Sequence, residues 1–233
     1  MKVKVCGMCD GENIRQVAEL GVDYIGMVFW PQSPRYVSMV PSRAGILPDR
    51  VVEGWTKPLA QAVGVFVDDM PQNIVTRVVN YRLDVVQLHG HETPTLVRNL
   101  RATLTTGGDK AIAPGLQLWK AISVAKREDV AQWRQYADCA DAFLFDTRCE
   151  GVGGSGRQFD WSVLEAYDGE KPFWLSGGIG PDDARRVADF CLAHPKCLGV
   201  DLNSRFETEP GLKDVDMLRG FLQKVATLTQ HPS

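Results

Sequence analysis

Short apolar runs alternate with amphipathic stretches along the whole chain. Each run ends in a polar residue or a glycine turn, and apolar residues at helical spacing come next. The runs predict eight strands, at residues 2–6, 23–29, 62–67, 84–88, 117–122, 142–146, 172–176 and 198–202. Strands that alternate with helices form a parallel sheet, and the count of eight favours closure into a (β/α)8 barrel, the TIM barrel of the α/β class.

The stretches between the runs carry helix signals. Asp10 is a typical N-cap before one helix, and Gly21 closes that helix. Pro71 stands where a second helix begins. The apolar face expected of this second helix comprises Ile74, Val75, Val78 and Val79. Further helices are expected at 93–100, 126–137, 181–192 and 213–228.

Two segments fit this plan less well. Residues 102–115 are rich in Thr, Gly and Pro and are predicted to form a surface loop or insertion. Residues 41–60 are predicted to be a helix broken by Pro48 and Pro58. The main alternative to a barrel is an open doubly wound sheet. That fold usually has fewer strands, and no G-x-G-x-x-G follows the first strand here.

Length and composition narrow the class of protein. The 233 residues are 44% hydrophobic and 24% charged, which suits one barrel domain spanning 1–233. The net charge is −3 and no basic stripe is present, so nucleic acid is not an expected partner. No apolar run approaches the roughly 20 residues that span a bilayer, and residues 1–5, which are expected to enter a strand at once, have no signal-peptide h-region. A cytoplasmic enzyme without membrane contact is expected, with its 6 cysteines reduced.

The barrel topology predicts where the chemistry lies. All strands of a barrel point their carboxyl ends at one mouth, where active sites are found. This end would gather polar residues that are far apart in the sequence. They are Cys6, Asp146, Ser176 and Asp201, with the loops that hold Arg35, His89, Gly154 and Gly178.

An acid and a thiol are the candidate catalytic groups. Asp146 ends a strand just before a glycine-rich loop, and it is either a turn cap or a general acid kept protonated by burial. Cys6 ends the first strand, and it is either a small buried hydrophobe or a general base whose pKa the site would have to lower. With Cys9 it also forms a C-x-x-C, but a zinc site would need further ligands, so no metal is expected.

Two features are suited to binding an anionic ligand. Gly177 and Gly178 follow the seventh strand and Ser204 follows the eighth, where barrels often bind phosphate through backbone N–H groups. The alternative is a turn that needs glycine conformations. Arg35, in a loop stiffened by prolines, is either a solvated charge or a partner for a substrate carboxylate.

With these motifs the chain resembles the phosphoribosylanthranilate isomerase family over nearly its whole length. The matching motifs are residues 4–8 (KVCGM), 29–37 (FWPQSPRYV), 63–67 (VGVFV), 86–90 (VQLHG), 145–147 (FDT), 153–156 (GGSG), 159–161 (FDW), 175–179 (LSGGI) and 199–204 (GVDLNS), then Glu207, 210–211 (PG) and 213–214 (KD). So many motifs in one order make the resemblance highly specific.

The resemblance implies an Amadori rearrangement in L-tryptophan biosynthesis, without metal or organic cofactor. Asp146 would protonate the furanose ring oxygen, and Cys6 would take the proton from the sugar C2. Arg35 would hold the anthranilate carboxylate, and the backbone around Gly177 and Gly178, with Ser204, would hold the phosphate. His89, Gly154 and Asp201 are counted as further substrate-binding residues. The protein would be a monomer or a homodimer.

This sequence departs from the family's pattern at three positions. Asn203 and Arg205 stand where relatives often have serine and glycine, and Cys9 is a cysteine where many have another residue. Two other functions stay open: another phosphosugar isomerase or epimerase, and a phosphate-binding pseudoenzyme. The other phosphosugar enzyme would need a metal-binding His/Asp set or paired aspartates at strands 1 and 5. The pseudoenzyme would be marked by loss of the acid or the base, but Asp146 and Cys6 are both present.

Overall fold

The computed structural model describes residues 1–38, 60–147 and 158–230. The helix predicted at 41–60 and the glycine-rich loop with Gly154 lie outside the described residues.

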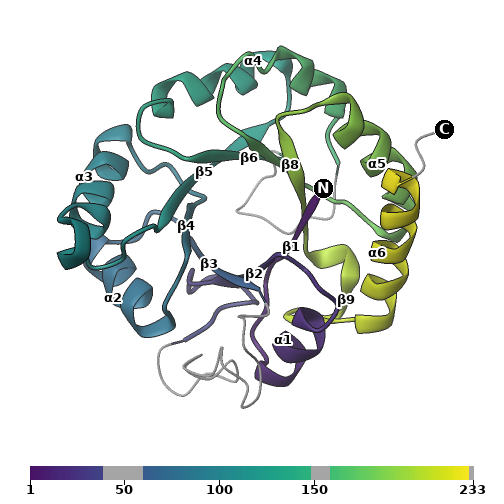
Figure 1. The fold of residues 1–233 in the computed structure, drawn as a ribbon, viewed down its shortest axis with the longest axis horizontal. Helices are drawn as coiled ribbons and strands as arrows, with labels where there is room; N and C mark the ends of the chain where they lie inside the picture. Colours follow the sequence, from purple (N-terminus) through teal and green to yellow (C-terminus); the bar gives the residue numbers. More distant parts are fainter. Residues whose placement is uncertain (39–59, 148–157, 231–233) are drawn as a thin grey trace.

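Eight parallel strands form a closed barrel, in which β1 pairs with both β2 and β8. Figure 1 shows this ring of strands inside an outer ring of helices. Closure confirms the predicted (β/α)8 fold and rules out the open sheet, because an open sheet would leave two edge strands unpaired. The strands are β1 Lys2–Val5, β2 Tyr24–Val28, β3 Gln61–Phe66, β4 Val85–Leu88, β5 Gln117–Val124, β6 Ala142–Thr147, β7 Phe173–Leu175 and β8 Cys197–Leu202.

Helices connect the strands on the outside. The α-helices are α1 Gly11–Ala18, α2 Pro71–Tyr81, α3 Pro94–Thr105, α4 Arg127–Val130, α5 Ala184–Ala193 and α6 Val215–Gln230. Short 3-10 helices are η1 Gly108–Lys110, η2 Ala131–Tyr136, η3 Trp161–Ala166, η4 Pro181–Asp183 and η5 Ser204–Phe206, and β9 Glu207–Glu209 pairs with β10 Leu212–Lys213. Within the described ranges, no helix has the length and apolarity required of a membrane span.

The predicted cap at Asp10 is confirmed. The Asp10 carboxylate accepts a hydrogen bond from the Asn13 N–H and starts α1. Asp160 caps η3 in the same way by accepting from the Ser162 N–H. Both caps satisfy donors that the first turn of a helix leaves free.

Three predictions for helices were wrong. Helix α3 continues to Thr105 instead of ending at Leu100, because Leu104 extends its buried face; the 102–115 loop is therefore shorter. The predicted helix at 126–137 is α-helical only in α4 and continues as the 3-10 helix η2. Val79 is 54% exposed, because the buried face of α2 follows Ile74, Val78 and Tyr81 at spacings of four and three residues.

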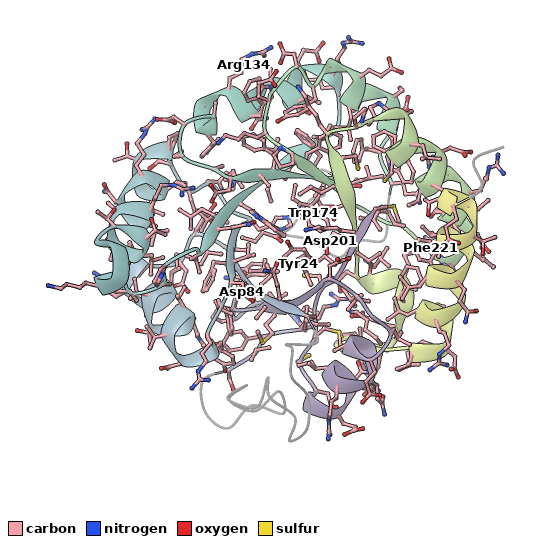
Figure 2. All side chains as sticks on the ribbon, viewed as in Figure 1. Tyr24, Asp84, Arg134, Trp174, Asp201 and Phe221 are labelled. Carbon is pink, nitrogen blue, oxygen red and sulfur yellow. The ribbon has the colours of Figure 1, made fainter. Side chains whose placement is uncertain are left out.

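Aromatic side chains fill the barrel interior. The rings of Tyr24, Trp119 and Trp174 contact one another, with centroids 5.0–5.2 Å apart. Figure 2 shows Tyr24 and Trp174 inside the ring of strands together with Asp201, whereas Arg134 lies on the outer rim. The barrel is therefore a packed core, and its polar groups gather toward the carboxyl ends of the strands.

Candidate active site

The predicted thiol shares the barrel interior with a buried ion pair. Lys4 lies on β1 and Cys6 directly follows its last residue, and both point inward because side chains alternate along an extended chain. Lys4 Nζ lies 2.8 Å from Asp201 Oδ1 on β8, and the Lys4 side chain is fully buried. A Cβ on Gly26 of β2 would lie 2.8 Å from Cys6 Sγ and 3.2 Å from Lys4 Cε, so this glycine makes room for both side chains.

Burial dominates the electrostatics of this group. Burial raises the pKa of the Cys6 thiol, while the neighbouring Lys4 ammonium opposes the rise. The predicted lowering of this pKa is therefore wrong, and a thiolate base would be the minor form of Cys6, with a share that grows as pH rises. Burial also raises the pKa of Asp201, again against the pull of Lys4. For Lys4 itself, burial lowers the pKa, but Asp201 and Cys6 outweigh it and the pKa stays above its ordinary value. The Lys4 ammonium is therefore the countercharge of both Asp201 and Cys6.

Asp146 lies at the end of β6 against His89. His89 Nε2 is 3.1 Å from Asp146 Oδ2, and both side chains are 13% exposed. On its other side, His89 Nδ1 is 2.9 Å from Gln87 Nε2. Gln87 Oε1 is buried without a hydrogen-bond partner among the described residues. An amide nitrogen only donates, so Gln87 Nε2 donates to His89 Nδ1, and the Nε2–H of His89 is left to donate to Asp146 Oδ2.

Asp146 and Cys6 lie at the same end of the barrel, at the carboxyl ends of β6 and β1. The charges of Asp146 and His89 both act on Asp201, and Asp201 in turn acts on Cys6. Ser176 Oγ, at the end of β7, lies 3.5 Å from Asp201 Oδ2. The structure thus places Cys6, His89, Asp146, Ser176 and Asp201 at the carboxyl ends of β1, β4, β6, β7 and β8. Gly154, predicted at the same mouth, lies outside the described residues.

The glycine pair after β7 adopts conformations that favour glycine. Gly177 has φ +93° and Gly178 has φ +64°. A Cβ on Gly177 would clash with Thr147 Oγ1 and lie 3.1 Å from Asp146 Oδ1. The turn therefore needs glycine for steric reasons, and it also exposes backbone next to the acid.

The predicted carboxylate partner is ion-paired within the protein. Arg35 is 8% exposed, so its interpretation as a solvated charge is wrong. Its Nε lies 2.9 Å from Glu207 Oε1, and its Nη2 lies 2.6 Å from Glu207 Oε2. Lys213 Nζ also donates to Glu207 Oε1. Two cations therefore share one carboxylate beside the mouth.

The positions at which this chain departs from the family pattern have identifiable surroundings. Asn203 Oδ1 accepts a hydrogen bond from Lys213 Nζ at 3.0 Å. Arg205 is exposed, and a Cβ on Gly180 would lie 3.0 Å from its Nε. Cys9 Sγ lies 3.6 Å from the Gly211 carbonyl oxygen. Within 1–38, 60–147 and 158–230, no three His, Cys, Asp or Glu side chains are grouped to hold a metal ion.

Sequence reasoning missed Lys4, Gln87, Glu207 and Lys213 as members of the site. All four lie inside quoted motifs, but Lys4 and Glu207 have side-chain partners that are distant in sequence. Lys4 gave a usable signal, since a charged residue two positions before Cys6 must share its face of the strand.

Comparisons with known proteins agree with this geometry. The sequence model described as N-(5'phosphoribosyl)anthranilate (PRA) isomerase matches residues 3–224. The chain belongs to the phosphoribosylanthranilate isomerase family. It is 42% identical to the N-(5'-phosphoribosyl)anthranilate isomerase of Parabacteroides distasonis, an alignment that covers 97% of this chain and 93% of that protein.

Solved structures of phosphoribosylanthranilate isomerases have the same fold. The enzyme from Thermus thermophilus is 27% identical, with a TM-score of 0.75, and 98% of this chain and 100% of that chain are covered. A phosphoribosylanthranilate isomerase in complex with reduced 1-(o-carboxyphenylamino)-1-deoxyribulose 5-phosphate is 28% identical, with a TM-score of 0.72 and the same coverage. The family predicted from the sequence motifs is confirmed.

Proposed function

We propose that this isomerase converts N-(5-phosphoribosyl)anthranilate into 1-(2-carboxyphenylamino)-1-deoxyribulose 5-phosphate, in L-tryptophan biosynthesis, with Asp146 as general acid and Cys6 as general base. The observation that carries the proposal is the family match over residues 3–224 together with an acid and a thiol at the same end of the barrel. The relative that binds the reduced product shows that the same fold accommodates a ligand of this chemistry.

The first step opens the sugar ring. Asp146 gives its proton to the furanose oxygen, the C1–O bond breaks, and the lone pair of the anthranilate nitrogen forms a C1=N Schiff base. His89 supports this step because its Nε2–H can donate a hydrogen bond to the carboxylate that Asp146 becomes after the transfer.

The second step moves a proton from carbon. The Cys6 thiolate takes the proton from C2, and the C–H electron pair forms C1=C2 as the iminium nitrogen regains its lone pair. The enolamine then takes a proton at C1 and loses one from the C2 hydroxyl, which gives the ketone. Protons and electrons balance within the substrate and these two residues, so the route needs no redox partner.

Binding groups complete the proposal. The backbone at Gly177 and Gly178, with Ser204, holds the phosphate, and Arg35 holds the anthranilate carboxylate. Gly154 remains a predicted contact outside the described residues. Asp201 is assigned to the Lys4 ion pair, which shapes the pocket around Cys6.

The test is turnover of freshly prepared phosphoribosylanthranilate, followed by loss of its anthranilate-type fluorescence. We expect complete conversion to the carboxyphenylamino ketose. Ribulose 5-phosphate, offered separately as the substrate of another phosphosugar isomerase or epimerase, should be left unchanged. Binding of a phosphate-bearing analogue without any turnover would contradict the proposal and favour a pseudoenzyme.

A further inference from the structure

Glu207 holds Arg35 along one edge of its guanidinium group. The carboxylate faces Nε, at 2.9 and 3.2 Å, and Nη2, at 2.6 Å. A guanidinium has five N–H groups, and this pairing uses the edge formed by Nε and one N–H of Nη2. The other edge, formed by Nη1 and the second N–H of Nη2, makes no hydrogen bond to a described residue. That edge has the geometry to bind a second carboxylate with two parallel hydrogen bonds.

Glu207 is itself fixed by other groups. Its side chain is 4% exposed, and its Oε1 accepts from Lys213 Nζ and, at 3.2 Å, from the Gly211 N–H. Lys213 is fully buried and is held in turn by Asn203 Oδ1. Burial alone would raise the pKa of Glu207, but its bonds to Arg35 and Lys213 outweigh burial and lower that pKa. Glu207 is therefore an ionised, immobilised clamp.

The clamp leaves one positive charge in excess. Arg35 and Lys213 are two cations, and Glu207 is the one anion that both contact. An uncompensated charge in a largely buried cluster is costly, and an anionic ligand group would offset that cost. A planar carboxylate on the free edge of Arg35 meets this need.

The backbone places Arg35 next to the thiol. A Cβ on Gly7 would clash with Arg35 Cδ and lie 2.5 Å from Asn203 Oδ1, so the arginine stem crosses the chain at the residue after Cys6. The positive φ of Gly7, +73°, is the backbone conformation that makes this crossing possible. A carboxylate held by Arg35 is thereby brought to the Cys6 side of the mouth.

We propose that Glu207 is a positioning residue for substrate specificity. It holds Arg35 by the Nε edge, so that the Nη1/Nη2 edge selects an aryl amine with an ortho carboxylate over one without it. This inference rests on the proposed function, because that function supplies the carboxylate. Glu207 acts through Arg35 and does not touch the substrate.

The test measures binding of two stable compounds by calorimetry. One is reduced 1-(o-carboxyphenylamino)-1-deoxyribulose 5-phosphate, and the other is the same compound without the carboxylate. Glu207→Gln should weaken binding of the first by about tenfold or more, since the arginine is no longer oriented, and leave binding of the second unchanged. Glu209→Gln, an exposed carboxylate on β9, is the matched control and should change neither Kd.

A double-mutant cycle separates positioning from a general structural effect. In an Arg35→Ala background, Glu207→Gln should have no further effect on either Kd, because Glu207 acts only through that arginine. Equal weakening of both ligands by Glu207→Gln, or tighter binding of the carboxylate ligand, would overturn the proposal. Tighter binding would show that Glu207 competes with the substrate for Arg35.

A second variant decides the question if Glu207→Gln does not fold. Arg35→Lys keeps the charge but removes the fork, so it should weaken binding of the carboxylate ligand only. Unchanged binding of that ligand would contradict the inference. Because these measurements use binding, they are independent of turnover. A wild-type protein that binds both ligands but converts no substrate would contradict the proposed function alone.

Discussion

Lys4 Nζ lies 2.8 Å from Asp201 Oδ1 in the barrel interior, and neither group has appreciable contact with solvent. Cys6 shares this space, with only the absent side chain of Gly26 leaving room for it. The ammonium group is thus the fixed countercharge for two acids, the Asp201 carboxyl and the Cys6 thiol. The buried Lys4–Asp201 pair therefore influences whether Cys6, the proposed base, is a thiol or a thiolate.

The dependence of the reaction rate on pH should follow the titration of the buried Cys6 thiol. Burial raises the pKa of Cys6 above its ordinary value, so most of the thiol is protonated at pH 7 and the thiolate fraction grows as pH rises. If the thiolate is the base, the proton transfer from C2 should speed up with pH, approaching tenfold per pH unit, until the thiol has titrated. Kinetics with substrate carrying deuterium at C2, between pH 6 and about 10, separates this step from the ring opening, which needs the proton of Asp146. A C2 proton-transfer rate that is flat over the range would contradict the assignment of Cys6.

Removing the countercharge should move this profile. Lys4→Met deletes the group that lowers the pKa of Cys6 most, so the rise of the C2 proton-transfer rate should shift to higher pH. It should also lower the free energy of unfolding by about 3–5 kcal/mol, because it breaks a buried ion pair.

Lys120→Met is the matched control for this shift. Lys120 is another buried lysine, paired with Glu92 at 3.0 Å, but it does not act on Cys6. Its substitution should cost similar stability and leave the pH position of the profile unchanged. Equal shifts in both variants would show that the change reflects general destabilisation.

Replacing the thiol should separate binding from chemistry. A hydroxyl is a far weaker base at neutral pH, so Cys6→Ser should lose about 10²–10⁴ in kcat. Binding of the reduced product analogue should stay within a few fold of wild type, since Cys6→Ser changes only one buried atom. Calorimetry and turnover on the same preparation provide the comparison. A kcat close to wild type would remove Cys6 from the mechanism.

Gly177 should tolerate no side chain. Its φ of +93° and the clash of a Cβ with Thr147 predict that Gly177→Ala costs at least about 1–3 kcal/mol of unfolding free energy. Activity should fall too, because the same Cβ crowds Asp146. Gly220→Ala is the control, since Gly220 lies in α6 with open space around it and should gain about 0.5–1 kcal/mol. Urea denaturation of both variants gives the two values, and equal effects would contradict the argument.

The sequence patterns were most informative at the ends of strands. Apolar runs mark β1 and β6, and the topology of a closed barrel then brings Cys6 and Asp146 to one mouth. The partners of these groups carried no local signal. Lys4 and Asp201 are 197 residues apart, so alternation along β1 placed the lysine on a face without revealing its partner.

The motifs did not reveal which charged residues pair with one another, because the ion pairs join residues far apart in the sequence. Arg35 and Glu207 are 172 residues apart and both lie in quoted motifs, but nothing in the spacing pairs them. The end of α3 was missed for a different reason. Thr103 and Thr105 look like loop residues, but their hydroxyls bond the carbonyls of Asn99 and Arg101 one turn earlier and so fit within the helix.

The most direct test of the acid–base account is turnover of freshly prepared phosphoribosylanthranilate by wild type and Asp146→Asn side by side. The amide keeps the size of the side chain and its contact with His89, but it has no acidic proton to give to the ring oxygen. The account predicts rapid loss of fluorescence with the wild type, a loss of about 10²–10⁴ in kcat for the variant, and unchanged binding of the reduced product analogue. Wild-type kcat in Asp146→Asn would contradict it.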